Sequence, residues 1–317
     1  MKKILITRRL LRACEEKASK IFDTKLNAND ELYSQSKLIE LSQGYDAVLT
    51  SLTEKMDEDT INKLPDSVKI ISNFAVGFGN IDLEAAKKRG IAVTNTPDVL
   101  TDATAEIAIL LILGAARRAS EGIEYAKNSS WKWSADFLIG KQLSGCKLGI
   151  LGMGRIGRAV AKRAKAFGME IHYHNRSKLN QSLEAGAIYH DSIKSLFSIA
   201  DILSINCPAT KETKKIINKK TLEFFSKEAI ITNSARGDMI DDDAMVDALK
   251  NKKIFALGLD VYNGEPDIHP GYLEHPNVFI LPHLGSATTK TRTDMADLAI
   301  SNIEEFFKNG KCINKVN

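Results

Sequence analysis

The sequence predicts a two-domain α/β protein whose domains are each built on a parallel β-sheet. Short apolar runs typical of buried parallel strands alternate with segments of helical length along most of the chain. One such run, residues 148–151, leads directly into three glycines at G-x-G-x-x-G spacing and then into another segment of helical length. A chain of 317 residues is long enough for two domains of ordinary size.

The composition is that of an ordinary globular protein, with 26% charged and 44% hydrophobic residues. Lys and Arg number 44 against 40 Asp and Glu, and a net charge of +4 is too small and too scattered to indicate a nucleic acid or a membrane surface as partner. The most apolar stretch, residues 107–116, is too short to span a bilayer, and the N-terminus lacks the apolar core of a signal peptide. We therefore expect a cytoplasmic protein.

The first domain is expected to comprise residues 1–98, with strands at residues 3–7, 46–50, 68–73 and 91–94. Residues 102–118 form an expected helix that is apolar nearly all round, with Asp102 or Thr101 as its N-cap. A final helix, residues 288–308, is expected to cross back, so that residues 288–317 complete the first domain.

The second domain is expected to comprise residues 99–287. It contains six expected strands, at residues 147–151, 169–174, 201–206, 229–234, 255–260 and 278–281. Six strands with crossover helices match the doubly wound parallel sheet of Rossmann type, which binds dinucleotides.

The glycine-rich turn gives each glycine a physical task. Gly152 allows the tight turn, Gly154 lets the backbone approach a pyrophosphate, and Gly157 allows helix and strand to pack closely. Arg155 and Ile156 open the following helix, whose free N–H groups and dipole favour phosphate. The alternative is a glycine-rich turn with no ligand.

Ligands of open parallel sheets bind beyond the carboxyl ends of the strands, so the residues at these ends are candidates for the site. At or shortly after the ends of the second to sixth expected strands lie Asn175, Arg176, Ser177, Cys207, Pro208, Ala235, Arg236, Asp260, Glu265 and His283.

Three of these residues suit acid–base and carboxylate chemistry. His283 is a candidate proton carrier, and Glu265 is a candidate partner that favours its protonated form. Arg236 offers a guanidinium fork for a carboxylate. The alternatives are a structural histidine, a loop carboxylate, and an arginine paired with Asp238 or Asp241.

The end of the second strand bears on cofactor choice. NAD sites usually place an acidic residue there, whereas this chain has Asn175 followed by Arg176 and Ser177, which suit a 2′-phosphate. This favours NADP(H); the alternative is a solvated basic loop that also accepts NAD(H).

No metal site is expected. His172 and His174 share one face of a strand, but no third ligand has suitable spacing. Cys207 lacks a base partner, which favours packing over nucleophilic catalysis. The four cysteines form no C-x-x-C pair, as expected for free thiols in a reducing compartment.

With these residues in view, the chain resembles the D-isomer-specific 2-hydroxyacid dehydrogenase family, and most closely its glyoxylate/hydroxypyruvate reductase branch. The motifs are LGILGMGRIG at residues 148–157 and, in addition, the segments at residues 76–106, 233–241 (NSARGDMID), 258–266 (GLDVYNGEP) and 281–288 (LPHLGSAT).

The resemblance implies a smaller flavodoxin-like substrate domain, a homodimer, and particular residue roles. Arg236 would orient the substrate, with Glu265 as the partner of the acid–base His283. The backbone of Val76 and Gly77 would hold the substrate carboxylate. Further implied residues are Ser51 and Leu52 in the substrate pocket, and Thr104 and Asp260 at the cofactor.

We therefore expect a reductase that transfers hydride from NADPH to a small 2-keto acid, glyoxylate or hydroxypyruvate, to give the D-2-hydroxy acid. One alternative is a dehydrogenase of another 2-hydroxy acid such as phosphoglycerate, or of phosphite or formate. The other is a dinucleotide-sensing interaction protein like the corepressors of this family, although the chain shows no long partner-binding extensions.

Overall fold

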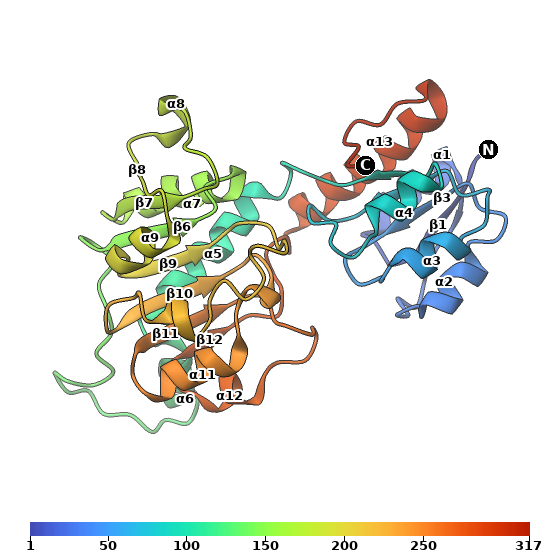
Figure 1. The fold of residues 1–317 in the computed structure, drawn as a ribbon. Coiled ribbons are helices and arrows are strands. Elements are labelled where there is room, and N and C mark those ends of the chain that lie inside the picture. Colours follow the sequence, from blue (N-terminus) through green and yellow to red (C-terminus); the bar gives the residue numbers. More distant parts are fainter. The chain divides into compact units, whose positions relative to one another are not determined.

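The computed structural model of the protein describes residues 1–317 and divides into two compact units (Figure 1). Unit 1 comprises Met1–Leu100 and Ser286–Asn317, and unit 2 comprises Thr101–Gly285. The boundaries at 100/101 and 285/286 each lie two residues from the expected positions, 98/99 and 287/288.

Unit 1 contains a five-stranded sheet in the order β2-β1-β3-β4-β5, with every neighbouring pair parallel. Its strands are β1 (Lys3–Ile6), β2 (Asp23–Lys25), β3 (Ala47–Thr50), β4 (Ile70–Asn73) and β5 (Ala92–Thr94). This order is that of flavodoxin-like sheets, whose topological switch point lies between β1 and β3.

The helices of unit 1 cover both faces of its sheet. They are α1 (Arg12–Ile21), α2 (Gln35–Leu41), α3 (Glu58–Lys63), α4 (Leu83–Lys88) and α13 (Thr289–Asn309). Alternate strand residues such as Val48 and Ile71 pack in one cluster with α2, α3 and α4. On β4, Ser72 donates from Oγ to the Ala299 carbonyl of α13 at 2.9 Å. The C-terminal segment pairs with the edge of β5, since Val316 N–H donates to Val93 O at 2.9 Å.

Unit 2 contains a seven-stranded parallel sheet in the order β12-β11-β10-β9-β6-β7-β8. Its strands are β6 (Lys147–Leu151), β7 (Glu170–His174), β8 (Ile188–Tyr189), β9 (Ile202–Ile205), β10 (Ala229–Asn233), β11 (Ile254–Leu259) and β12 (Val278–Ile280). Numbered within the unit this is the doubly wound order 3-2-1-4-5-6 with one more strand at the end.

Two apolar cores lie against this sheet. One joins α5 and α7 to strand residues that include Ile202 and Ile230, and the other joins α9 and α11 to Leu203 and Ile231. The side chains of adjacent residues, 202 and 203 on β9 and 230 and 231 on β10, thus point to opposite faces of the sheet, as strand geometry requires. The helices of this unit are α5 (Thr101–Ala116), α6 (Ala119–Lys127), α7 (Arg155–Ala166), α8 (Gln181–Glu184), α9 (Ile193–Ile199), α10 (Lys219–Leu222), α11 (Asp242–Lys250) and α12 (Pro270–Glu274), with a 3-10 turn at Gly237–Met239.

Three expectations about elements were wrong. Each sheet has one more strand than predicted, β2 and β8, because these edge strands are too short to form an apolar run. Helix α5 begins at Thr101, so neither Thr101 nor Asp102 is its N-cap; both lie in the first turn. Helix α6 was not predicted, and it contains no buried residue.

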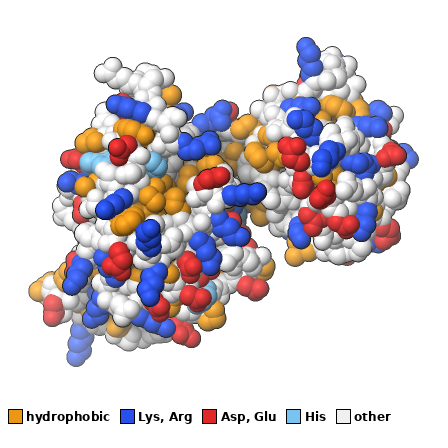
Figure 2. All heavy atoms as spheres, viewed as in Figure 1, with side chains coloured by type: hydrophobic (Ala, Val, Ile, Leu, Met, Phe, Trp, Pro, Cys, Tyr) orange, Lys and Arg blue, Asp and Glu red, His pale blue; other side chains and the backbone are white.

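The surface carries both signs of charge interspersed over the visible face of each unit (Figure 2). None of the helices combines the length and apolar character that crossing a bilayer requires.

Candidate active site

The glycine-rich turn joins β6 to α7, and its shape depends on two glycines. Gly152 has φ +94°, and a Cβ there would lie 2.5 Å from the Cys207 backbone nitrogen. A Cβ on Gly157 would lie 2.3 Å from the Gly152 carbonyl oxygen. By contrast, a Cβ on Gly154, the N-cap of α7, would meet no atom within 4 Å. The turn is therefore packed where helix meets strand and open at the helix N-terminus, which fits a dinucleotide pyrophosphate.

Asn175, at the end of β7, stabilises this turn. Its Oδ1 accepts a hydrogen bond from the Met153 N–H at 2.6 Å. Arg176 and Ser177 follow and are exposed. Arg176 lies near enough to Glu212 to help lower the pKa of that carboxyl, although hydrogen bonding from Thr210 is the largest cause. The candidate groups for a 2′-phosphate are thus Arg176 and Ser177, while the Asn175 oxygen is already used by the turn.

Cys207 packs against the turn as a neutral thiol. Burial raises the pKa of Cys207 to about 12, so the nucleophilic thiolate does not form near neutral pH. The structure thus supports the packing interpretation.

His283 and Glu265, the expected acid–base pair, lie within hydrogen-bond distance of each other. His283 Nδ1 lies 2.6 Å from Glu265 Oε2, and Glu265 Oε1 accepts from the Tyr262 N–H at 2.9 Å. Burial opposes ionisation of Glu265, but the hydrogen bonds from His283 and Tyr262 and the charge of Arg236 outweigh it and lower the pKa of Glu265. An ionised Glu265 at Nδ1 fixes the ring and leaves Nε2 for a substrate.

Asp260 holds the loop that carries His283. This aspartate is 1% exposed, and its two oxygens accept from Leu284 N–H at 2.7 Å and Gly285 N–H at 2.9 Å. Thr104 donates from Oγ1 to the Gly285 carbonyl at 3.0 Å. His283 itself has φ +56°, a strained value for a non-glycine residue that these contacts maintain. Asp260 and Thr104, implied as cofactor contacts, therefore support the loop that carries His283.

Arg236 lies on the turn after β10 without an ion pair to Asp238 or Asp241. Its Nη1 donates to its neighbour's carbonyl, Ala235 O, at 2.6 Å, while Asp241 caps α11 and pairs with Lys215 at 3.0 Å. Burial lowers the pKa of Arg236 against the opposing charges of Glu265 and Asp238. A half-buried guanidinium with most donors unused is suited to binding a carboxylate.

Two residues that the sequence interpretation did not single out shape this turn. The fully buried Asn233 accepts at Oδ1 from Ala235 N–H at 2.9 Å and donates from Nδ2 to Arg236 O at 2.7 Å. A Cβ on Gly237 would lie 1.9 Å from the Tyr262 carbonyl carbon, so the Arg236 turn packs directly on the segment leading to Glu265. Asn233 and Gly237 both lie near Arg236 in the 233–241 motif. Membership of this motif was the one feature of the sequence that could have indicated their importance.

Unit 1 contains the other candidate residues. The carbonyls of Val76 and Gly77 accept from Asn95 Nδ2 and Asn73 Nδ2, each at 2.8 Å. The N–H groups of Val76 and Gly77 donate no hydrogen bond within the chain. Ser51 is buried and Leu52 is 40% exposed.

His172 and His174 interact with His190 in unit 2. His172 Nδ1 lies 2.9 Å from His190 Nε2, and its Nε2 lies 2.6 Å from Glu170 Oε1. His174 Nδ1 lies 2.8 Å from the His190 carbonyl oxygen. No group of three His, Cys, Asp or Glu side chains in the structure could hold a metal ion.

Comparisons with known proteins place these features in context. Residues 109–285 match the family model described as "D-isomer specific 2-hydroxyacid dehydrogenase, NAD binding domain". The chain is 42% identical to a glycerate dehydrogenase of Hyphomicrobium methylovorum, over 96% of each sequence.

Solved structures agree over the full length. A D-isomer-specific 2-hydroxyacid dehydrogenase from a Polaromonas species is 41% identical, with a TM-score of 0.94 and 100% of both chains covered. An NADPH-dependent glyoxylate/hydroxypyruvate reductase from Sinorhizobium meliloti, in complex with NADP and malonate, is 31% identical with a TM-score of 0.89, covering 99% of this chain and 96% of that one.

Proposed function

Since the chain belongs to the D-isomer-specific 2-hydroxyacid dehydrogenase family, we propose that it reduces glyoxylate or hydroxypyruvate to the D-2-hydroxy acid with a nicotinamide cofactor. The observation that carries this proposal is the 2.6 Å contact between His283 Nδ1 and Glu265 Oε2, in the same unit as the dinucleotide-type turn.

Different residues of the chain would perform different steps of such a reduction. Glu265 accepts from Nδ1 and stabilises the protonated ring, so that Nε2–H donates a proton to the keto oxygen. In unit 2, Arg236 binds a carboxylate and polarises the carbonyl. In unit 1, the N–H groups of Val76 and Gly77 are proposed as donors to a carboxylate. When bound, the reduced nicotinamide supplies the hydride to the carbonyl carbon.

The test is the loss of reduced nicotinamide absorbance with glyoxylate and with hydroxypyruvate, measured for NADPH and NADH in parallel. We expect turnover with wild-type protein and a loss of about 10²–10⁴-fold in His283→Ala, because the proton donor is removed. NADPH binding, followed by fluorescence, should be unchanged in this variant. Absence of turnover with both acids and both cofactors would refute the proposed reaction.

We further propose a preference for NADPH, with NADH also accepted. Arg176 and Ser177 are exposed at the end of β7, and no acidic residue precedes them to repel a 2′-phosphate. Arg176→Asp should shift the ratio of kcat/KM values towards NADH by about tenfold or more, because the carboxylate repels the phosphate and accepts from ribose hydroxyls. The matched control is Arg12→Asp on α1 of unit 1. An unchanged ratio would contradict the role of Arg176.

Finally, we propose a homodimer that resides in the cytoplasm. Several exposed apolar side chains lie within one part of the sequence, on α5, α6 and the segment after them. They are Leu110, Ile123, Tyr125, Trp131, Trp133 and Ile139. Such a concentration is typical of an interface between subunits.

A further inference from the structure

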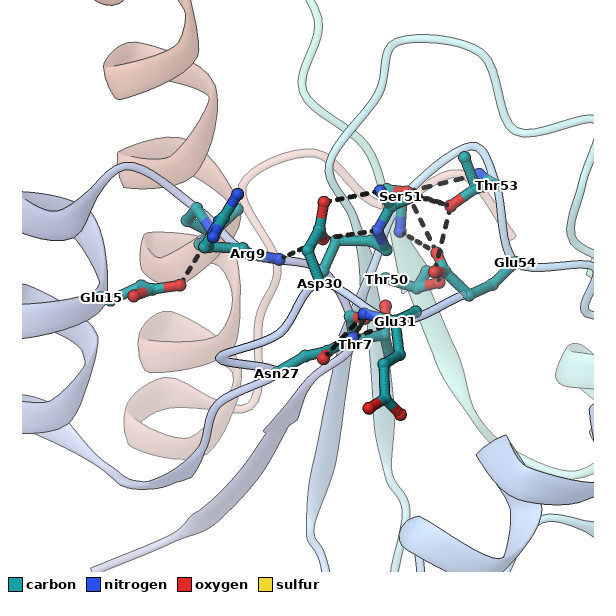
Figure 3. Close-up of polar contacts among 12 residues, drawn as sticks. Thr7, Arg9, Glu15, Asn27, Asp30, Glu31, Thr50, Ser51, Thr53 and Glu54 are labelled. Carbon is teal, nitrogen blue, oxygen red and sulfur yellow. Dashed lines mark hydrogen bonds and ion pairs between the residues drawn. The ribbon is translucent and has the colours of Figure 1, made fainter. Parts of the chain in front are cut away.

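A buried carboxylate organises the loop after β3. Glu54 is 2% exposed. Its Oε2 accepts from Ser51 N–H at 2.8 Å, Thr50 Oγ1 at 3.0 Å and Ser51 Oγ at 3.1 Å, and its Oε1 accepts from Thr53 Oγ1 at 3.1 Å. Figure 3 shows these three side chains gathered around the Glu54 carboxylate. A buried charge is tolerated only when it is bonded in this way, so the conformation of residues 51–54, here the β3 loop, depends on Glu54.

The segment after β1 is tied to the same loop. Arg8 Nη1 donates to Thr53 Oγ1 at 2.8 Å. Its Nε and Nη2 donate to the two oxygens of Asp30 at 2.8 and 2.9 Å. Asp30 also accepts from the Arg9 N–H at 2.9 Å (Figure 3). Because β1 and β3 flank the switch point of this sheet, the network lies where open parallel sheets bind ligands.

Asn80 connects the β3 loop to residues 76–80, here the β4 loop. Its side-chain Nδ2 donates to Ser51 O at 2.9 Å and to Glu54 O at 3.0 Å. The main-chain carbonyl of Asn80 accepts from the Met56 N–H at 2.7 Å. The β4 loop also contains Val76 and Gly77, whose N–H groups donate no hydrogen bond within the chain. The Asn80 side chain thus sets the position of the β3 loop relative to the backbone amides of Val76 and Gly77.

We propose that Glu54 and Asn80 are positioning residues for substrate binding, which hold the β3 and β4 loops in the arrangement that receives the carboxylate of the keto acid. Neither touches the reacting atoms. The inference rests on the proposed function, since Val76 and Gly77 bind the carboxylate there. When the loops are already ordered, binding of the substrate does not have to include the free-energy cost of ordering them. Loosening these loops therefore weakens substrate binding more than it lowers turnover.

Two variants with opposite changes of charge separate positioning from electrostatics. Glu54→Gln removes a negative charge and replaces charge-assisted hydrogen bonds by weaker neutral ones. Asn80→Asp adds a negative charge and removes both donors to the β3 loop. If charge alone mattered, KM for an anionic substrate would fall in the first variant and rise in the second. Positioning predicts that KM rises in both, by about tenfold, with kcat changed less than about twofold.

The controls and a second measurement make the test independent of turnover. Glu58→Gln and Asn62→Asp change exposed residues of α3 in the same unit and should leave KM unchanged. Affinity for oxalate, a dicarboxylate that cannot be reduced, is measured by calorimetry on protein saturated with oxidised cofactor. It should fall about tenfold in both test variants, while cofactor affinity stays the same.

The outcomes are distinguishable. If wild-type protein reduces neither keto acid but binds oxalate, the proposed reaction fails, and weaker oxalate binding in both variants still supports positioning. Variants that bind oxalate as wild type does, or whose KM values move in opposite directions, overturn the positioning roles. Wild-type protein that neither turns over nor binds oxalate overturns both proposals.

Discussion

At the scale of single residues, the site depends on side chains that act through a neighbour. His283 is oriented by Glu265 at 2.6 Å, and its loop is held by Asp260 and Thr104. The place of the histidine at a strand end made it a candidate proton carrier. The hydrogen bonds that Asp260 accepts from the Leu284 and Gly285 N–H groups were not apparent, because sequence spacing does not show which atoms of a side chain are already engaged.

Glu265→Gln should lower reductive turnover most at alkaline pH. The pKa of Glu265 is lowered despite its burial, so the carboxylate is charged across the working range and stabilises the protonated His283. A neutral glutamine withdraws that stabilisation, so kcat should fall more at alkaline than at neutral pH. The measurement is kcat against pH for both proteins. An identical profile with uniformly reduced kcat would mean that Glu265 only shapes the loop.

At the scale of elements, the sequence predicted what strong patterns encode. The apolar run before Gly152 and the strand end before His283 were located correctly, because buried strands and a glycine turn leave a local signature. Strands β2 and β8 leave none, since they are only three and two residues long at sheet edges. The packing of Gly237 on Tyr262 is likewise absent from the local pattern, because the two residues belong to different strand–loop segments that only the folded sheet brings together.

Gly237→Ala should destabilise unit 2 and reduce activity. The added methyl would lie 1.9 Å from the Tyr262 carbonyl carbon, so the Arg236 turn or the segment leading to Glu265 must shift. We expect a loss of about 1–3 kcal/mol in the free energy of unfolding, measured with urea. Gly122→Ala is the matched control, because a Cβ there meets no atom within 4 Å. Equal stability of both variants would show that the turn accommodates the methyl.

At the scale of the whole molecule, the exposed apolar side chains are the basis of the proposed homodimer. Trp133 is 82% exposed and Trp131 is 53% exposed, which is costly for a monomer in water. Helix α5, by contrast, is mostly buried within unit 2, and Leu110 is one of its exposed positions.

Sedimentation should give a mass of about 70 kDa, twice the 34.9 kDa of one chain. Replacing Trp131 and Trp133 together by serine should weaken the association by about tenfold or more, because aromatic anchors dominate interface energies. Leu273→Ser, a change at a similarly exposed apolar residue on α12, is the control. A monomeric wild-type protein at micromolar concentration would contradict the homodimer.

The composition of unit 1 from two separate chain segments has a consequence for synthesis. Its five strands leave the ribosome first, but helix α13 and the C-terminal residues that pair with β5 leave it last. Unit 2 lies between these two segments in the sequence, so all of unit 2 is synthesised before the helix that covers one face of the unit 1 sheet. During translation the nascent unit 1 therefore exposes the sheet face that α13 later covers, and it relies on the emergence of the last few dozen residues to bury that face.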